Sequence, residues 1–313
     1  MRPEDHEQIS VMYQGHTVFV IEVAPYDVPP VIKVNGTPWV RQGTTTRKAN
    51  DSDLRRLDER RPIHLQPFDV RPVQGASLQD LDEELLRQRY NAVRGADEDP
   101  GSFLEFNTWL AQEGLGGRQG DDFVPSVAGL LVYGLNPQSF FSGAEVDLTR
   151  YRGTDFDAEI IARKRFVGAV PGQMRSLWDY FGALIEDEAQ PERGMVAEFI
   201  PTYPLDALKE LVRNMLQHRD YAATRAPARI AWFEDSITFS NPGGPFGQAS
   251  QGELGEHSDY RNPALTRLLV DLGYVERAGR GLRRVRSLLK RQGHPPLEVE
   301  KNGFTSITLR RRP

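Results

Sequence analysis

Residues 203–221 read YPLDALKELVRNMLQHRDY, and this stretch decides how the C-terminal part of the chain folds. Its apolar residues recur at the spacing of one face of an α-helix. The pattern therefore predicts a helix over 205–218. Its expected buried face consists of Leu205, Leu208, Leu211, Val212, Met215 and Leu216, and the opposite stripe consists of Glu210, Asn214 and Gln217.

The residues after this helix alternate between regular elements and glycine-containing turns. Strands are expected over 228–233 and 236–240, and the second strand ends in the turn 241–244, NPGG. The further expected elements are a helix over 262–272, a helix that follows Gly279 and Gly281, and a closing hairpin over 297–299 and 304–309.

The polar stripe of the first helix carries groups that suit nucleotide chemistry. Glu210 and Asn214 are four residues apart and share a helix face, where a carboxylate can act as a general base and an amide oxygen can bind a metal ion. Glycines let a backbone approach a phosphate, and the free amides of a helix N-terminus favour an anion. Ordinary amphipathic helices also carry Glu and Asn on their solvent-exposed face, so this pair alone does not predict a phosphate site. The order of the elements favours such a site more strongly: a polar helix stripe, two strands that end in a glycine turn, and a helix that starts at glycines.

Together these segments resemble a known family. YPLDALKELVRNMLQHRDY, ITFSNPGG, RNP and ERAGRGL are similar to successive signatures of the C-terminal domain of RecG-like, helicase-related transcriptional regulators. That domain is itself similar to the GHKL (histidine-kinase-type) ATPases, and the resemblance covers 126–313. It implies ATP and Mg²⁺ as cofactors, Glu210 as the catalytic base, Asn214 as the metal ligand, and a nucleotide-binding set of Asn214, Asn241, Gly243, Gly244, Gly279 and Gly281.

The chain departs from the GHKL pattern at two places. The family has an aspartate at the start of the glycine turn, which accepts a hydrogen bond from the adenine amine, whereas this chain has Asn241 followed by Pro242. An amide oxygen can accept the same bond but carries no charge. The second glycine box is reduced to Gly279-x-Gly281. The resemblance therefore implies ATP binding and leaves hydrolysis open, with weak ATPase activity at most.

The N-terminal residues form a separate β-rich segment. Alternation over 16–23 predicts a strand, Asn35-Gly36 predicts a hairpin turn, and a short helix is expected from 50 to 60. Residues 18–57 resemble the C-terminal half of the Schlafen/Alba-type DNA-binding domain, through Trp39, Arg41, Gly43 and Thr44 to Thr46. The family's N-terminal half is not recognisable, so an incomplete unit is expected.

Trp39 and Arg41 are the candidate nucleic-acid contacts of that unit. A tryptophan ring can stack on a base and an arginine can contact a phosphate, as in proteins that hold single strands. The ordinary alternative is a packed ring beside a solvated charge.

The expected fold class is α+β. It comprises a partial Alba-type β unit (1–62), a linker (63–76), a helical and mixed α/β middle region (77–193) and a GHKL-like α/β sandwich (194–313). In the middle region we expect helices that begin at Ser77 and Ser102, strands over 126–134, 144–153 and 160–170, and a helix over 173–188.

Composition and charge argue against a membrane-spanning protein and against nucleic-acid binding through the overall charge of the chain. The 313 residues include no cysteine and carry a net charge of −5, so a nucleic-acid contact needs a local basic patch. The helix 280–291 offers one, with Arg283, Arg286 and Lys290 opposite an apolar face, although a solvated helix face is the ordinary alternative. No apolar run is long enough to span a membrane, and a cytoplasmic location is expected.

Two misleading motifs are also set aside. His218-Arg219-Asp220 imitates the catalytic triplet of protein kinases, but the asparagine that should follow is Arg225, and no other kinase motif is present. The chain also has no G-x-x-x-x-G-K-[ST] sequence for a P-loop motor.

Two functions of different classes remain. The first is a nucleotide-responsive transcriptional regulator or DNA-associated protein that binds ATP in its GHKL-like domain. The second is a non-hydrolysing scaffold or dimerisation protein with a degenerate nucleotide site. DNA or another nucleic acid, bound weakly through this chain alone, is the expected partner; a second copy of the chain is a further candidate, and no membrane is expected.

Overall fold

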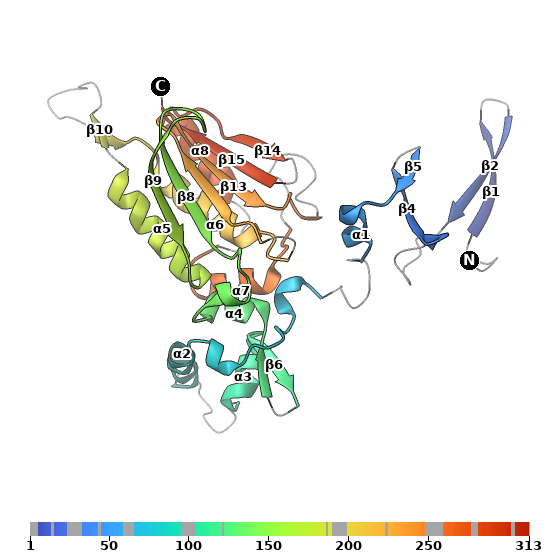
Figure 1. Cartoon of the computed structure of the whole chain (residues 1–313), viewed down its shortest axis with the longest axis horizontal. Helices are drawn as coiled ribbons and strands as arrows, with labels where there is room; N and C mark the ends of the chain where they lie inside the picture. The colour runs from blue at the N-terminus through green and yellow to red at the C-terminus, as the bar shows by residue number, and fades with distance from the viewer. Residues whose placement is uncertain are drawn as a thin grey trace. The chain divides into compact units, whose positions relative to one another are not determined.

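A computed structural model of the chain describes residues 6–13, 16–23, 33–42, 45–58, 66–95, 104–120, 122–185, 187–189, 199–222, 225–247, 259–276, 281–301 and 304–312. The chain divides between Gln66 and Pro67 into two compact units, which are described separately here (Figure 1). This division falls inside the segment 63–76, where the sequence predicts a linker. Among the described residues, no helix has the length and apolar character needed to cross a bilayer.

The first unit contains two small antiparallel sheets and one helix. β1 (His6–Tyr13) pairs with β2 (His16–Val23), and β3 (Lys33–Val34), β4 (Thr37–Gln42) and β5 (Thr45–Lys48) form the second sheet in that order. The expected turn between β3 and β4 is present, because Asn35 and Gly36 both have positive φ angles, 51° and 77°.

The helix of the first unit, α1 (Asp51–Asp58), is capped by its own sequence. The side-chain oxygen of Asn50 accepts the backbone N–H of Asp53 at 2.9 Å, and the Asp53 carboxylate accepts the N–H of Asn50 at 3.0 Å. Two donors that the helix leaves unpaired are thus satisfied reciprocally. The expected strand, hairpin turn and short helix of this segment are all confirmed.

The second unit is built on one mixed sheet of six strands, in the order β14-β15-β13-β12-β8-β9. β8 and β12 are parallel, and the other neighbours are antiparallel. The strands are β8 (Val146–Arg152), β9 (Glu159–Phe166), β12 (Ala228–Trp232), β13 (Ser236–Pro242), β14 (Glu298–Lys301) and β15 (Phe304–Arg310). The segments on either side of residue 194 therefore share one sheet.

Helices cover one face of this sheet, as Figure 1 shows: α5 (Val170–Leu184), α6 (Leu205–His218) and α8 (Gly281–Arg291). The core lies between the helices and the sheet. There the centroid of the Phe181 ring of α5 lies 5.6 Å from that of Trp232 and 6.2 Å from that of Phe239. On the other face the strands carry hydroxyl pairs, such as Thr238 with Thr308 at 2.9 Å. This alternation of apolar and polar faces confirms the α+β class.

The remaining elements pack as a smaller helical layer with a short hairpin. They are α2 (Glu83–Gly95), α3 (Phe106–Gln112), β6 (Gly116–Gln119), β7 (Asp122–Pro125), α4 (Val127–Tyr133) and α7 (Pro263–Asp271), with the pair β10 (Asp187–Ala189) and β11 (Phe199–Pro201) elsewhere. Asp69 holds α7 within this layer, because its buried carboxylate accepts the N–H of Leu265 at 2.8 Å.

The prediction of a strand over 126–134 is wrong, since this segment forms α4. All seven residues from Val127 to Tyr133 are buried, so the segment is apolar on every side and shows neither the helix period nor the strand period. Its start is marked by Ser126, whose hydroxyl accepts the N–H of Gly129 at 3.0 Å as an N-cap.

Candidate nucleotide site

The site is organised around α6, whose faces lie as the sequence predicts except at two positions: Leu205 of the apolar face is half-buried, and Gln217 of the polar stripe is buried. Leu208, Leu211, Val212, Met215 and Leu216 are buried, and α6 packs against α5, α8 and β13. The polar stripe faces α7 and α8. Near its C-terminal end the amide nitrogen of Gln217 donates to the hydroxyl of Thr266 in α7 at 3.1 Å.

The structure brings Glu210 and Gly281 together. Gly281 is the first residue of α8, and a Cβ atom added to it would collide with the Glu210 carboxylate, coming within 2.5 Å of its Cδ. Any other residue at this position would have to displace the Glu210 carboxylate from the start of α8. Because the first amides of a helix lack internal partners and carry partial positive charge, this point favours a negatively charged group.

A hollow of about 620 Å³ extends from this contact between α6 and α8. Five cationic and three anionic side chains line it, so its charge suits a polyanion. Arg213 lies 3.5 Å from the Glu210 carboxylate, and Arg284 pairs with Glu276 at 3.1 Å. The charged lining residues are Asp206, Lys209, Glu210, Arg213, Glu276, Arg283, Arg284 and Arg291.

The predicted glycine turn lies against the other end of α6. Gly243 has a φ of +95°, and a Cβ atom added there would lie 2.8 Å from the Cβ of Asp220. The N–H of Asp220 donates to Pro242 O at 3.2 Å. Arg261 fixes the arrangement by donating to the Asp220 carboxylate at 2.7 Å and to Gly244 O at 3.0 Å. The turn is thus held rigidly just beyond the helix.

Asn241, at the head of this turn, points into the helix-covered layer. It follows Ile237 and Phe239 at two-residue intervals on β13, and all three are buried. Its side-chain oxygen is buried and has no hydrogen-bond partner among the described residues. A buried acceptor without a donor costs free energy, so this oxygen is suited to a donor supplied by a ligand.

Two predicted site residues remain less defined. The Asn214 side chain is half-buried and makes no hydrogen bond to any residue that the structure describes. Gly279 lies outside the described residues. Within the described part of the chain, no group of three or more acidic or histidine side chains is arranged to hold a metal ion.

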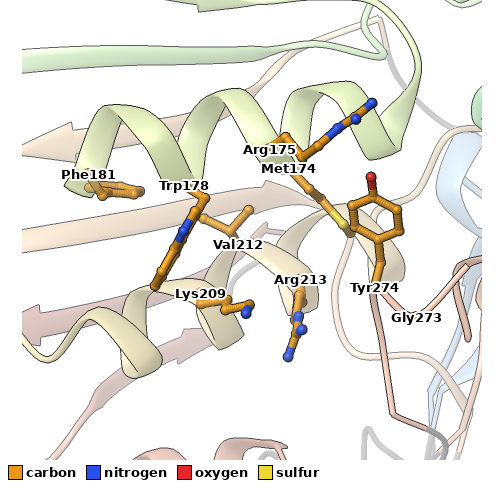
Figure 2. Close-up of a pocket in the computed structure, with 9 residues that line it drawn as sticks. All are labelled: Met174, Arg175, Trp178, Phe181, Lys209, Val212, Arg213, Gly273 and Tyr274. Carbon is orange, nitrogen blue, oxygen red and sulfur yellow. The ribbon is translucent and has the colours of Figure 1, made fainter. Parts of the chain in front are cut away.

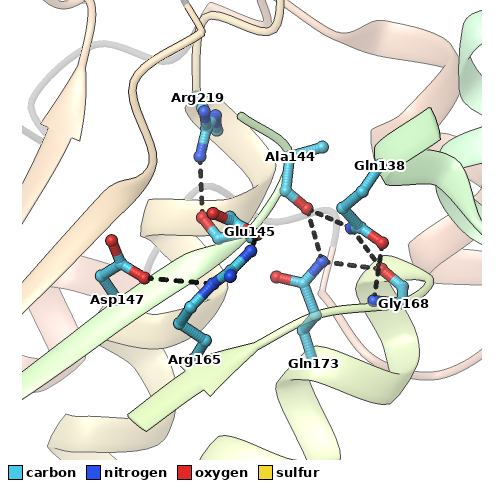
Figure 3. A network of polar contacts seen from close by, with 8 residues as sticks. All are labelled: Gln138, Ala144, Glu145, Asp147, Arg165, Gly168, Gln173 and Arg219. Carbon is cyan, nitrogen blue, oxygen red and sulfur yellow. Dashed lines mark hydrogen bonds and ion pairs between the residues drawn. The ribbon is translucent and has the colours of Figure 1, made fainter. Parts of the chain in front are cut away.

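The sequence reasoning missed the structural role of Arg219, because it treated His218-Arg219-Asp220 only as a false kinase motif. Arg219 is 1% exposed and donates to Glu145 O at 3.0 Å (Figure 3). It also donates to Ala226 O at 2.5 Å. It therefore ties the end of α6 to the residues that precede β8 and β12. Burial lowers its pKa, while Tyr221, Glu145 and Asp220 act in the opposite direction. The sequence feature that indicates this structural role is the position of Arg219 directly after the C-terminus of the predicted helix.

Figure 3 shows that this contact belongs to a wider polar network at the start of β8. The Glu145 carboxylate accepts from Arg165 at 2.5 Å. Gln173 in α5 donates to Ala144 O and Gly168 O, both at 2.8 Å. Residues from four segments thus fix the edge of the sheet beside α5.

His218 gives the site a pH dependence that can be measured. Its ring stacks on Tyr260 at 5.9 Å, and burial, together with Arg261, lowers its pKa from 6.5 to about 4. The folded state therefore holds His218 neutral, whereas the unfolded chain binds a proton below pH 6.5. This contribution to stability is present above pH 6.5 and is lost as the pH falls toward 4.

We expect the free energy of unfolding to fall with decreasing pH in this range, with His218 contributing up to about 1.4 kcal/mol per pH unit. His218→Phe keeps a ring against Tyr260 and removes the titration, so its curve should be flatter. Urea unfolding of both proteins between neutral and mildly acidic pH measures the difference. Parallel curves would show that His218 is not held neutral.

The candidate nucleic-acid residues are divided between the two units. Trp39 is 43% exposed on β4, and Arg41, two residues later on the same face of the strand, donates to the Thr46 hydroxyl at 3.2 Å. Arg283, Arg286 and Lys290 lie on α8 in the second unit. Leu282, Val285 and Leu289 are buried on the opposite face, as predicted.

Comparison with known proteins places the C-terminal segment in a class. Residues 226–309 match the family "Putative ATP-dependent DNA helicase recG C-terminal", a segment that runs from β12 to β15 and contains both predicted glycine turns. This segment is therefore similar to an ATPase-like domain of the RecG C-terminal type. The match begins after α6 and does not extend to the N-terminal unit, so the Schlafen/Alba resemblance stays a prediction.

A solved structure resembles a larger part of the chain. The DIP2311 protein from Corynebacterium diphtheriae superposes with a TM-score of 0.59 at 20% sequence identity, over 98% of this chain and 60% of that chain. The likeness shows a shared fold, and the chain spans about three fifths of the length of that structure. No curated protein matches.

Proposed function

We propose that the surface formed by α6, the turn after β13 and the start of α8 binds an adenine nucleotide with Mg²⁺, and that the chain is a nucleotide-responsive, DNA-associated regulator with weak ATPase activity at most. The observation that carries the proposal is the approach of Gly281 to Glu210, which places a helix N-terminus beside a carboxylate of the polar stripe. The family match of residues 226–309 supports it.

The described residues fit an adenine nucleotide at two points. The buried Asn241 oxygen lacks a donor, and the exocyclic amine of adenine supplies one. The start of α8 lies directly beside the Glu210 carboxylate, and once that flexible side chain turns away, the amides there are suited to phosphate oxygens.

The two points lie toward different ends of α6, since Gly243 packs against Asp220 and Gly281 against Glu210, so a ligand that contacts both must extend along the helix. Eight residues separate Glu210 from His218, which is about 12 Å along the axis of α6. The base would lie at the C-terminal end, beside Asn241 and the Gly243-Gly244 turn. The phosphates would lie toward the hollow between α6 and α8, whose charged lining includes more cations than anions.

Glu210 and Asn214 would have different roles at this site, the first as general base and the second as metal ligand. Asn214 has a side-chain oxygen that is not engaged by any described residue and can hold the metal ion. Mg²⁺ would supply charge neutralisation of the phosphates. Glu210, one turn earlier, can accept a proton from an attacking water, while Arg213 at 3.5 Å orients its carboxylate.

The scaffold function is the second candidate, and one observation favours it. The Glu210 carboxylate itself lies at the start of α8, where a phosphate would otherwise bind. In that arrangement the glutamate acts as a permanent anionic cap of α8, and the domain serves protein association without a nucleotide.

Two variants separate binding from chemistry. Asn214→Ala should abolish the Mg²⁺-dependent part of ATP binding, because it removes the metal ligand. Glu210→Gln should leave binding largely unchanged and reduce any hydrolysis by about 10²- to 10⁴-fold, since only the transition state uses its basicity. Calorimetry and a phosphate-release assay measure the two effects. A Glu210→Gln protein that hydrolyses ATP at the parent rate would remove Glu210 from the mechanism.

The nucleic-acid part of the proposal rests on α8 and the first unit. If Arg283, Arg286 and Lys290 contact phosphates, the triple change to glutamate should reduce the salt dependence of duplex binding by about 2.7 in the slope of log K against log salt. Fluorescence anisotropy at several salt concentrations measures the slope. Arg163→Glu with Arg229→Glu is the matched control, because both arginines are exposed on strands of the sheet. An unchanged slope in the triple variant would exclude α8 from the interface.

A further inference from the structure

A second, apolar pocket of about 220 Å³ lies between α5, α6 and the residues after α7 (Figure 2). Met174, Trp178 and Phe181 come from α5, and Val212 comes from α6. Figure 2 shows Tyr274 across Met174 from Trp178, so that aromatic rings stand on two sides of the pocket. Neither the family match nor the proposed nucleotide contacts assign it a ligand.

The size of the pocket selects a small ligand. An apolar cavity of about 150 Å³ in a protein interior holds one benzene molecule. The 220 Å³ here therefore accommodate one aromatic ring with a short substituent. Met174, Phe181 and Val212 are already buried, which gives such a ring a dry, apolar contact surface.

The charged residues around the pocket favour a ligand whose substituent carries a negative charge. Arg175, Lys209 and Arg213 line it, and no carboxylate is among the lining residues. Figure 2 shows Lys209 beside the Trp178 ring, with its ammonium nitrogen 5.0 Å from the ring centroid. The cation is thus held at the edge of the apolar wall, where it can pair with an anionic group on a ligand whose ring is inside.

We propose that this pocket binds a small aromatic carboxylate, with its ring between Trp178 and Tyr274 and its carboxylate at the edge formed by Lys209 and Arg213. A carboxylate matches the planar fork of an arginine and the point charge of a lysine. The pocket shares Lys209 and Arg213 with the lining of the hollow between α6 and α8, whereas Trp178 and Tyr274 line the pocket alone.

Phenylacetate is the probe, and its neutral amide, phenylacetamide, is the matched control. The whole chain has four tryptophans, so its indole N–H signals can be followed by NMR and the Trp178 signal assigned with Trp178→Phe. We expect phenylacetate to shift the Trp178 signal in a saturable way and to bind about tenfold or more tightly than phenylacetamide, because only the acid can pair with the cations.

Variants then locate the charge recognition. The double variant Lys209→Gln with Arg213→Gln should bind phenylacetate about tenfold or more weakly than the parent does. It should also bind the acid no more tightly than phenylacetamide. Arg284 lines the hollow between α6 and α8 but not this pocket, so Arg284→Gln should leave the affinity for phenylacetate unchanged. Gly281→Ala, which alters the nucleotide site, should also bind phenylacetate normally, so that failure of one site is distinguishable from failure of the other.

Three outcomes would overturn the proposal. They are no shift of the Trp178 signal at millimolar phenylacetate, equal affinity for the acid and the amide, or an unchanged acid affinity in the Lys209 and Arg213 double variant. Each would show either that the pocket stays empty or that its cations do not recognise an anion.

Discussion

Replacing Arg219 with leucine is expected to lower the free energy of unfolding of the second unit by about 3 kcal/mol, because it removes two charge-assisted hydrogen bonds from a buried position. The guanidinium is 1% exposed and donates to Glu145 O and Ala226 O. These bonds join the end of α6 to two neighbouring strands, so their loss also loosens the residues on which the glycine turn rests.

The measurement for Arg219 is urea unfolding, with Arg229→Gln as the control. Arg229 is an exposed arginine of β12, and its replacement should change stability by less than about 0.5 kcal/mol. Buried ionic groups are sometimes replaced by apolar residues without loss. If Arg219→Leu is as stable as the parent protein, the arginine is not a structural tie, and its role has to be sought in ligand binding.

Replacing Gly281 with alanine should leave the protein folded and impair the nucleotide site. The added Cβ would displace the end of the Glu210 side chain, which is flexible and 27% exposed, so the cost to stability should be below about 1 kcal/mol. Because the added methyl group displaces the Glu210 carboxylate and lies at the start of α8, where the phosphates are proposed to bind, ATP affinity should fall by about tenfold or more. Any hydrolysis should fall by about 10²-fold or more.

A second glycine provides the control for this prediction. Gly182 lies inside α5, and a Cβ atom there would meet nothing within 4 Å. Gly182→Ala should therefore stabilise the chain by about 0.4–1 kcal/mol and leave nucleotide binding unchanged. A Gly281→Ala protein that binds and hydrolyses ATP like the parent would show that the start of α8 is not part of the site.

Much of this site could be predicted from sequence, because its parts are local patterns. The apolar period of 205–218 predicts α6 and places Glu210 and Asn214 on its polar stripe, and the glycines predict the tight turn at Gly243. The charge pattern of 280–291 predicts the buried and exposed faces of α8 in the same way.

The parts that could not be predicted depend on contacts between distant segments. α4 was taken for a strand because a helix that is buried on every side has no visible period. Arg219 pairs with carbonyls near two strands, and Asp69 caps a helix almost two hundred residues later. The pocket between α5 and α6 likewise exists only once both helices are packed, since its aromatic and cationic residues are far apart in sequence.

Titration calorimetry of the whole chain with ATP, with and without Mg²⁺, tests the nucleotide site most directly. We expect a saturable heat with Mg-ATP that is smaller without the metal and is reduced in Asn214→Ala. At about 100 times its dissociation constant, the ligand should also raise the free energy of unfolding by about 2.7 kcal/mol. If neither ATP nor ADP gives any heat at millimolar concentration, the nucleotide function is contradicted, and Glu210 is a cap of α8 in a scaffold domain.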